Sequence, residues 1–351
     1  MGVIVGCKLS RSRAYVALVV VGAAVVLGSC SSATPTNGTA ASTNATGAGT
    51  SSIAAKWSNP VRIDPDAALS GLSCPSSSFC MAADNAGSAF TYANQRWSSP
   101  ALVGSGSSGG DFDAAVSCPT TSFCAAVSGS DAFTYSSGSW SSGEAIDTLS
   151  GGSGLVDVSC PTISFCMAVG EGNEAWTYSS GSWSSAVQVT ASGADIAPVS
   201  CASPTFCIAL DESGDAYTYS GNSWSAPAQI ASPEENPSLI SLSCPSPSFC
   251  VAVGENGPSW TYSAGTWSKG ANVTGSGTIR SVSCPTTSFC MAADMTGDAY
   301  VSTGGSWSTA GQLPGAAAAK ASHGGGGGQV SCASASFCVL LGANGDAWIY
   351  S

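Results

Sequence analysis

The side chains best suited to chemistry in this 351-residue chain are its cysteines. Fourteen of the sixteen cysteines form seven pairs with five residues between partners: Cys74 and Cys80, Cys118 and Cys124, Cys160 and Cys166, Cys201 and Cys207, Cys244 and Cys250, Cys284 and Cys290, and Cys332 and Cys338. A structural metal site generally needs four converging ligands, whereas each pair supplies two. Cysteines on either side of a short turn can bring their Cβ atoms to about 4 Å, which suits a bridge. The spacing therefore favours seven local disulfides. Metal or redox roles are the alternative, and no metal or cofactor is predicted.

Carboxylates are the second group of candidates. Five of the seven units carry an acid just before their third predicted strand: Asp131, Glu174, Asp215, Asp298 and Asp346. Other acids, including Asp84, Asp211 and Asp294, follow the second cysteine by four residues. If the units form a ring, these turns gather on one face as an acidic rim that could bind a cation or a basic partner. Turn chemistry is the alternative reading, because Asp and Gly favour hairpin turns.

Catalytic groups are scarce in the sequence. The only histidine, His323, precedes the glycine run Gly324–Gly328, and so flexible a loop does not fix a general base. We therefore expect the chain not to be an enzyme. The alternative is a glycan hydrolase or lyase that uses carboxylates at a channel mouth, which for hydrolysis would have to lie about 5 or 6.5–9.5 Å apart. Asp157, Arg280 and Gln329, each found in one unit only, are predicted near the axis.

The cysteine pairs belong to a repeated unit whose first cysteines lie 40 to 48 residues apart, which is the period of a four-stranded propeller blade. Ser precedes the first cysteine and Phe precedes the second in every unit. Short β-branched and aromatic runs separated by Gly, Ser, Asn and Asp predict four strands per unit. No sustained 3.6-residue apolar period is found in the repeats, so no helices are expected there.

The spacing of tryptophans predicts how the ring closes. In six units a Trp that opens the fourth strand lies 22 or 23 residues after the first cysteine, but the seventh unit stops at Ser351 before this strand. The segment Lys56–Asp64, which contains Trp57, can supply the missing strand. We therefore predict an all-β, seven-bladed β-propeller closed by this N-terminal strand, which protects the sheet edges. An open solenoid is the alternative.

The N-terminal segment has the composition of an export signal. Lys8, Arg11 and Arg13 precede an apolar run from Ala14 to Leu27, which is shorter than the roughly 20 residues of a membrane span. The following residues, Leu27-Gly28-Ser29-Cys30, resemble the lipobox of bacterial lipoproteins. This resemblance implies acylation of Cys30, with fatty acids such as palmitate, and a location on the extracytoplasmic side of the cell membrane. An ordinary secretory signal is the alternative.

Cysteine counting supports acylation, because Cys30 is the one cysteine beyond the signal that has no partner within a repeat. We accordingly divide the chain into a signal peptide (1–29), a lipidated cysteine with a disordered Ser/Thr/Ala/Gly tether (30–54) and the propeller (55–351).

Two further resemblances concern the repeat. The turn before the fourth strand, as in Tyr262-Ser263-Ala264-Gly265-Thr266-Trp267, resembles a degenerate Asp-box of sialidase-type propellers without its Asp, which bears on architecture only. Arg62 and Arg96 fall on the outer strand, so the arginine triad of a sialidase cannot form. The Ser-Cys-x-x-x-Ser-Phe-Cys unit resembles secreted repeat proteins of actinobacteria, which implies no particular reaction.

Charge and aromatic content narrow the function. Beyond the signal, six basic residues stand against 21 acidic residues, which disfavours nucleic acid and anionic lipid headgroups. Trp176, Trp260, Trp348 and the fourth-strand tryptophans could stack on sugars, but their recurrence predicts packing between blades. We expect a monomeric, lipid-anchored, non-catalytic platform that binds an envelope protein or a polysaccharide.

Overall fold

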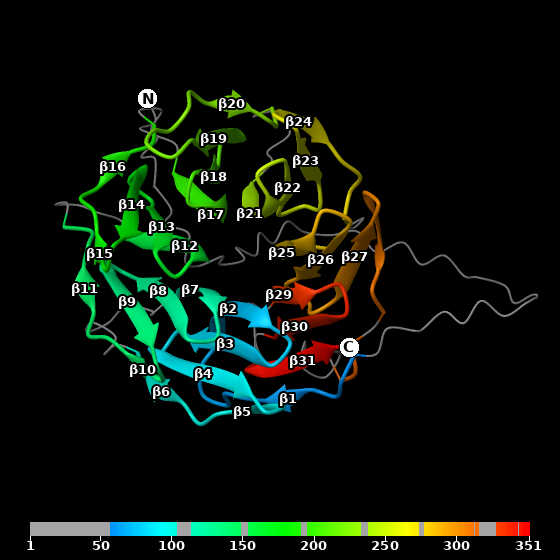
Figure 1. Ribbon diagram of the computed structural model, residues 1–351. Helices are drawn as coiled ribbons and strands as arrows, with labels where there is room; N and C mark the ends of the chain where they lie inside the picture. The colour runs from blue at the N-terminus through cyan, green and yellow to red at the C-terminus, as the bar shows by residue number, and fades with distance from the viewer. Residues whose placement is uncertain are drawn as a thin grey trace, which may run out of the picture. The chain divides into compact units, whose positions relative to one another are not determined.

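The computed structural model describes residues 57–103, 114–148, 154–190, 195–232, 238–273, 277–311, 313–315, 328–342 and 344–351. Within these ranges the chain forms seven antiparallel sheets arranged as the blades of a ring, and no helix (Figure 1). Accordingly, none of these residues belongs to a helix that could cross a membrane. The predicted fold class, an all-β seven-bladed β-propeller, is confirmed.

Each blade has strand positions a to d, from the axis outward. Position a is occupied by β2 (Leu69–Ser76), β7 (Ala115–Thr120), β12 (Leu155–Thr162), β17 (Ile196–Ser203), β21 (Leu239–Ser246), β25 (Ile279–Thr286) and β29 (Gln329–Ser334). Position b is occupied by β3 (Phe79–Asp84), β8 (Phe123–Ser128), β13 (Phe165–Gly170), β18 (Phe206–Asp211), β22 (Phe249–Gly254), β26 (Phe289–Asp294) and β30 (Phe337–Leu341).

Position c is occupied by β4 (Ser88–Ala93), β9 (Asp131–Ser136), β14 (Glu174–Ser179), β19 (Asp215–Tyr219), β23 (Ser259–Ser263), β27 (Ala299–Thr303) and β31 (Asp346–Tyr350). Position d is divided in three blades, into β5 (Arg96–Trp97) with β6 (Ala101–Leu102), β10 (Ser139–Trp140) with β11 (Glu144–Ala145), and β15 (Ser182–Trp183) with β16 (Val187–Gln188). The remaining d strands are β20 (Ala228–Gln229), β24 (Thr266–Lys269), β28 (Ser306–Thr309) and β1 (Val61–Arg62).

All seven predicted disulfides are present, and each joins strands a and b of one blade, with Cα–Cα distances of 3.9 to 4.1 Å. The bonded pairs are Cys74 with Cys80, Cys118 with Cys124, Cys160 with Cys166, Cys201 with Cys207, Cys244 with Cys250, Cys284 with Cys290, and Cys332 with Cys338. The second cysteine of every pair is the second residue of strand b, where it is at most 3% exposed. These fourteen residues therefore do not serve as metal ligands or free thiols.

Strand a does not end at the first cysteine of its blade. It continues past this residue, for example to Thr162 in β12. The residue after the cysteine lies at a break in the strand register in every blade. Five blades have Pro there, which cannot donate a ladder hydrogen bond and is tolerated at a bulge.

The serine before each first cysteine joins neighbouring blades. Its hydroxyl accepts a hydrogen bond of 2.9 to 3.0 Å from the backbone N–H of the first cysteine in the next blade. The bond from Cys74 N–H to Ser331 Oγ connects the last blade to the first and completes the circle. The recurrence of this serine therefore follows from contact between blades.

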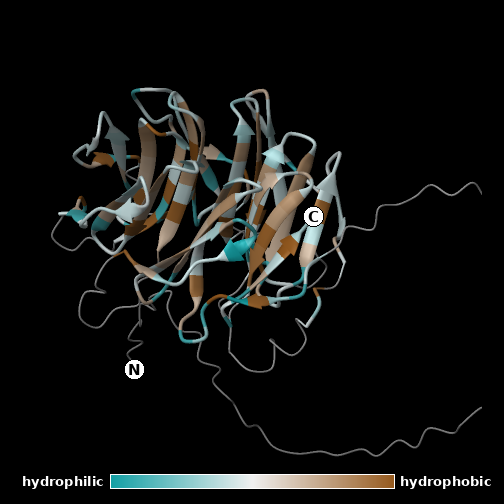
Figure 2. Ribbon diagram, turned by 60° about the horizontal axis from the view of Figure 1, so that its bottom comes forward, coloured by the Kyte–Doolittle hydropathy of each residue, from teal (hydrophilic) through white to brown (hydrophobic). Residues whose placement is uncertain are grey.

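The hydrophobic core is divided into seven clusters, one in each interface between neighbouring blades. Figure 2 shows the apolar residues along the strands and paler or hydrophilic residues in the turns. Trp176, Trp260 and Trp348 on strand c are each 1% exposed and lie in these clusters, as predicted. The disulfides extend this core, because both cysteines of a pair are buried within the same interface.

The N-terminal segment completes the last blade. Val61 and Arg62 pair with Ala347 and Asp346 on β31, and Trp57 forms a further bridge with Tyr350. This register matches that of a complete blade, where Trp183 pairs with Tyr178 and Val187 with Ala175. Closure of the ring by this segment is therefore confirmed, and the open solenoid is excluded.

Candidate functional site

The five acids predicted to form a rim lie at equivalent positions on one edge of the ring, one in each of five blades. Four of them begin strand c, and Asp298 immediately precedes β27. Asp346 is buried and the other four are half-buried. The structure therefore places them on the same face but does not bring them together. No group of three or more His, Cys, Asp or Glu among the described residues could hold a metal ion.

Three acids at the end of strand b stabilise the turns that lead to strand c. Asp84, Asp211 and Asp294 are at most 2% exposed. Asp84 Oδ1 accepts hydrogen bonds from the N–H groups of Ala86 and Ser88, at 2.9 and 2.7 Å. Asp211 and Asp294 likewise accept backbone N–H groups, and each also accepts a tyrosine hydroxyl from strand c. These three carboxylates have the turn-forming role that was the alternative to an acidic rim.

Several carboxyl groups on this face retain protons more readily than free ones. Burial raises the pKa of Glu174, and the charge of Asp147 adds to the effect. Burial also raises the pKa of Asp215, with a contribution from Asp211. Desolvation raises the pKa of Asp84, and a contact with the Asp64 carboxyl group raises it further. Burial, with a smaller contribution from neighbouring carboxyl groups, therefore raises the pKa of these three side chains.

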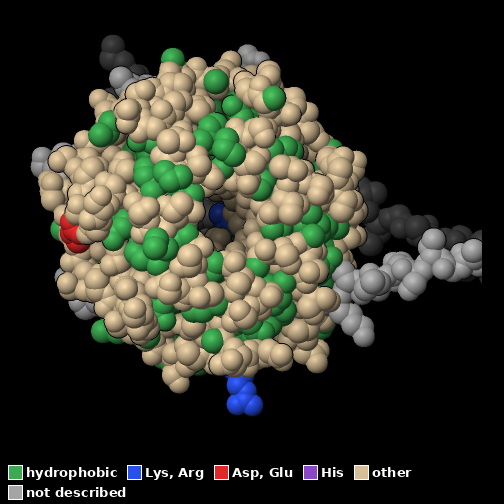
Figure 3. Space-filling model, in the orientation of Figure 1, with side chains coloured by type: hydrophobic (Ala, Val, Ile, Leu, Met, Phe, Trp, Pro, Cys, Tyr) green, Lys and Arg blue, Asp and Glu red, His purple; other side chains and the backbone are tan. Residues whose placement is uncertain are grey.

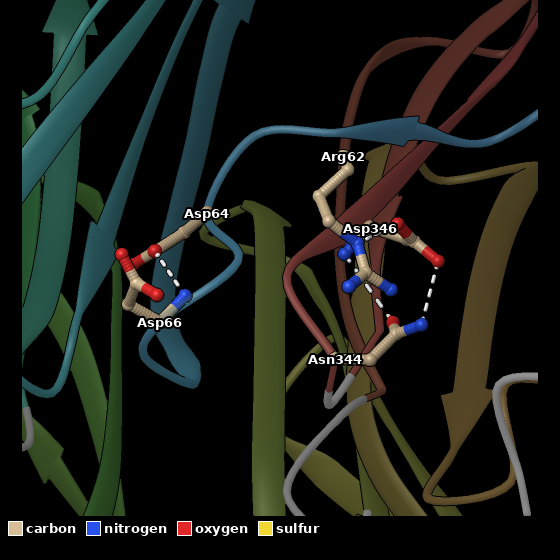
Figure 4. Close-up of polar contacts among 5 residues, drawn as sticks. All are labelled: Arg62, Asp64, Asp66, Asn344 and Asp346. Atoms are coloured by element: carbon tan, nitrogen blue, oxygen red, sulfur yellow. Dashed lines mark hydrogen bonds and ion pairs between the residues drawn. The ribbon is translucent and has the colours of Figure 1, made fainter. Parts of the chain in front are cut away.

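Asp346 is engaged at the closure of the ring. Figure 4 shows the side chain of Arg62 directed at this carboxylate, with an Nε–Oδ1 distance of 3.1 Å. Asn344 donates a hydrogen bond of 2.6 Å to the other carboxylate oxygen. Asp346 therefore joins the N-terminal strand to the last blade.

The axis of the ring is hollow, and Figure 3 shows a Lys or Arg side chain inside it. On the inner strands that the structure describes, Arg280 is the only basic residue. Its buried Nε has no hydrogen-bond partner. Asp157 lies on β12, with its two carboxylate oxygens accepting N–H groups from Val158 and Val199 at 2.8 Å each. Burial raises the pKa of Asp157 to about 7. Gln329 begins β29, so all three predicted axial residues lie on inner strands.

On the inner strands within the described residues, Asp157 is the only residue with a carboxylate side chain. The pair of axial carboxylates that a glycan hydrolase would need is therefore not found on these strands. Cys30 and His323 lie outside the described residues, as do residues 30–54 and 316–327.

The outer wall carries two grooves that were not predicted. One, of about 480 Å³, lies between the first two blades and is lined by Thr91, Ser98, Ser99, Ala101, Leu102, Tyr135, Gly138, Ser139 and Trp140. The other, of about 400 Å³, lies between the second and third blades and is lined by Ala132, Thr134, Ser141, Ser142, Gly143, Glu144, Tyr178, Gly181 and Trp183. The recurring Tyr and Trp residues were the sequence signal for these grooves. The fourth-strand tryptophans pack against the clusters between blades, as predicted. They are only half-buried, so they also form part of the surface.

No family model matches the sequence, and no curated protein matches it either. The fold is similar to solved propeller structures. A streptogramin B lyase matches with a TM-score of 0.68 and 8% identity, covering 85% of this chain and 97% of the other. A virginiamycin B lyase from Staphylococcus aureus, solved with quinupristin, matches with a TM-score of 0.68 and 6% identity over 85% of this chain and 99% of the other. The protein YCF48 bound to a D1 peptide matches with a TM-score of 0.62 and 14% identity over 86% and 96%.

At these identities the likeness concerns the fold alone. It nevertheless corrects one expectation, namely that the chain is not an enzyme, which rested on the absence of a catalytic motif. Lyases share this architecture, so a propeller without a familiar motif gives no ground for excluding catalysis.

Proposed function

We propose that this chain is a lipid-anchored protein of the bacterial cell envelope whose propeller is a binding platform for an envelope protein or a polysaccharide. The boundaries 1–29, 30–54 and 55–351 describe its signal, its tether from Cys30 and its platform. The observation that carries the proposal is the closed ring, braced by one disulfide in each blade and by hydrogen bonds between all neighbouring blades. Such a ring holds its turns and outer wall in fixed positions, as a binding surface requires.

Further observations support this proposal. Seven disulfides suit an oxidising compartment outside the cytoplasm. The lipobox-like sequence before Cys30 and the resemblance to secreted actinobacterial repeat proteins agree with export. Among proteins of the same fold, one is bound to a peptide and another was solved with quinupristin. The acidic composition favours partners that are neutral or basic.

The anchor is tested by fractionating cells that express Cys30→Ala. We expect this variant to leave the membrane fraction, because a protein without acyl chains and with a cleaved signal has no remaining anchor. Cys7→Ala, inside the signal, is the matched control and should remain with the membrane. A Cys30→Ala protein that is processed and still sediments with membranes would refute lipidation at this residue.

The platform is tested by cross-linking intact cells and purifying the wild-type protein. The proposal predicts recovery of a defined envelope protein or polysaccharide at a fixed ratio to the propeller. The secreted Cys30→Ala protein, which has the same propeller but lacks the anchor, serves as the control for adhesion to the matrix. Recovery of the wild-type propeller alone would contradict the proposal.

A lyase activity is the second candidate, and Asp157 is the observation that favours it. A carboxyl group whose pKa is about 7 can exchange a proton at neutral pH, as a general base must. Incubation of envelope glycans with the wild type and with Asp157→Ser tests this idea. New unsaturated products with the wild type and none with the variant would support it, and products from neither protein would refute it.

A further inference from the structure

The two grooves on the outer wall are built in the same way. In each, a Tyr and a Trp of one blade face a Thr and two Ser of the preceding blade: Tyr135 and Trp140 with Thr91, Ser98 and Ser99, and Tyr178 and Trp183 with Thr134, Ser141 and Ser142. Figure 1 shows the corresponding strands, β6 with β10 and β11 with β15, as neighbours on the outside of the ring. Both volumes lie within the range of about 300–1,000 Å³ that is usual for ligand sites.

The groove walls combine aromatic rings with hydroxyl groups. The Tyr135 and Trp140 rings are 5.4 Å apart between centroids, as are those of Tyr178 and Trp183. Leu102 adds an apolar surface that is 71% exposed. Aromatic faces pack against the C–H surfaces of a ligand, while hydroxyl groups fix its polar atoms. A pyranose ring offers both kinds of surface.

Charge selects among carbohydrates. No Lys or Arg lines either groove, and Glu144 in the second groove is the single charged residue of the two linings. The whole chain is acidic, with a formal net charge of −12. An anionic glycan would therefore be repelled and would meet no cation in the groove. A neutral glycan would incur neither cost.

An extended peptide is a poorer fit to the same wall. Strand addition needs a regular edge of free N–H and C=O groups, but position d here is interrupted between β5 and β6. At this interruption the hydroxyl of Ser98 accepts the N–H of Thr91 at 3.0 Å. The edge is therefore irregular where a peptide would have to pair.

The same aromatic pair recurs around the ring. Six blades place a strand-c Tyr 5.3 or 5.4 Å from a strand-d Trp: Tyr350 with Trp57, Tyr92 with Trp97, Tyr135 with Trp140, Tyr178 with Trp183, Tyr219 with Trp224, and Tyr262 with Trp267. The sixth blade has Ser302 opposite Trp307. Several equivalent weak sites on one rigid ring gain avidity for a ligand that repeats its own unit. A polymer of sugars has this property.

We propose that the grooves between blades on the outer wall bind a neutral polysaccharide, with hexopyranose residues seated against Trp140 and Trp183. This inference rests on the proposed binding platform and identifies its site and ligand class. The ring of Tyr–Trp pairs extends the site beyond the two grooves, so a long chain would bind more tightly than a short oligosaccharide.

The test is native electrophoresis of the mature protein through gels containing mannan, arabinogalactan, galactan or an α-glucan, one at a time. Polygalacturonate serves as the acidic probe. At least one neutral polymer should retard the wild type, while polygalacturonate should not. Ser99→Arg with Ser142→Arg, at exposed groove positions, should fill both grooves and raise the apparent Kd at least tenfold.

The matched control is Ser122→Arg with Ser164→Arg, on exposed a–b turns of the second and third blades, which makes the same change in charge away from the grooves. It should bind like the wild type. Trp140→Ala with Trp183→Ala should also lose binding, and thermal unfolding shows whether this variant is folded. Migration unaffected by every neutral polymer, or equal retardation of the groove-filled protein and its control, would overturn the inference. If a protein partner is then recovered from cross-linked cells, the platform stands and only the glycan site is wrong.

Discussion

Asp157 occupies a position where the fifth and sixth blades have serine. Its carboxylate accepts the N–H of Val199 at 2.8 Å, just as Ser241 and Ser281 accept the N–H of Val282 and Val330 at 3.0 and 2.7 Å. Asp157 therefore accepts the same hydrogen bond as the two serines, but its ionised carboxylate also places a negative charge where little water can solvate it. This charge is the reason that its pKa rises from 3.8 to about 7.

The elevated pKa predicts how stability depends on pH. Between pH 3.8 and about 7, the folded state holds a proton on Asp157 that the unfolded state has released. The stabilisation that this proton gives to the folded state is therefore complete below pH 3.8 and is lost as pH rises through about 7. Asp157→Ser keeps the bond to Val199 and removes the titration. We therefore expect the variant to gain stability relative to the wild type between pH 5 and pH 8, by up to about 4 kcal/mol in the free energy of unfolding.

Circular dichroism melts at several pH values provide the measurement. Ser241→Asp is the reciprocal control, because it should introduce the same pH dependence in another blade. A difference in Tm between Asp157→Ser and the wild type that stays constant from pH 5 to pH 8 would refute this assignment.

The cysteine pairs were predictable because their chemistry is local. Five intervening residues suffice to place both thiols across one hairpin, whatever the rest of the chain does. The roles of the acids were less predictable. The repeat places Asp84 four residues after the second cysteine and Asp131 just before the third strand. It does not show that Asp84 accepts the N–H groups of its turn, which only the structure reveals. The surface exposure of the fourth-strand tryptophans was hard to predict for a similar reason, because the exposure of Trp140 depends on side chains of the preceding blade.

At the scale of elements, the turn before β31 controls the approach of the N-terminal strand. Ile63 and Asp64 donate backbone hydrogen bonds to the carbonyl of Gly345, at 2.8 and 3.3 Å. Gly345 has φ +77°, and a Cβ there would overlap the carbonyl group of Asp64. The close approach of the two chain ends therefore requires glycine.

Gly345→Ala should consequently weaken closure more than an equivalent change elsewhere. Gly297→Ala is the matched control, since Gly297 has φ +81° in the same turn of the sixth blade but its nearest atom is Leu313 Cδ1 at 3.8 Å. Both variants carry the cost of a positive φ, of order 1–2 kcal/mol, and only Gly345→Ala adds the overlap. Chemical denaturation should show the larger loss for Gly345→Ala. Equal losses would mean that the N-terminal strand does not approach this turn.

The four strands of each blade followed from the sequence, but their irregularities did not. A bulge at Pro161 depends on how β13 pairs with β12, and periodicity in one strand does not show it. Likewise, the division of position d into β5 and β6 arises because Ser98 bonds back to Thr91. These interruptions leave the outer edge of the sheets without a regular row of hydrogen-bonding groups, which protects the ring from edge-to-edge association.

At the scale of the molecule, stability depends on seven interfaces that form a circle. Each blade packs against two neighbours, so the loss of one strand disturbs the whole ring. The N-terminal segment is held by Val61 and Arg62 on β31, by the ion pair of Arg62 with Asp346, and by a hydrogen bond from Trp57 Nε1 to the carbonyl of Ala310 at 3.1 Å. These contacts join residues about 250 to 290 positions apart in the chain.

Closure could be predicted from the sequence because the seventh unit has no fourth-strand Trp, whereas Trp57 precedes the first unit and belongs to no other blade. The location of the ligand could not be predicted, because the grooves are formed by residues of two blades. Tyr135 and Trp140 become one wall of a site only when Thr91 and Ser98 supply the other.

The most direct test of this account compares a chain that begins at Ile53 with one that begins at Ala67, by thermal unfolding and size-exclusion chromatography. The shorter chain lacks Trp57 and β1. Burial of a large aromatic side chain contributes about 2–3 kcal/mol, and the lost strand also removes ladder hydrogen bonds. The account predicts that the shorter chain aggregates or melts at least about 6 °C lower, because β31 becomes an open edge. A chain beginning at Ala67 that stays monomeric and melts with the longer one would contradict a ring closed by its N-terminal strand.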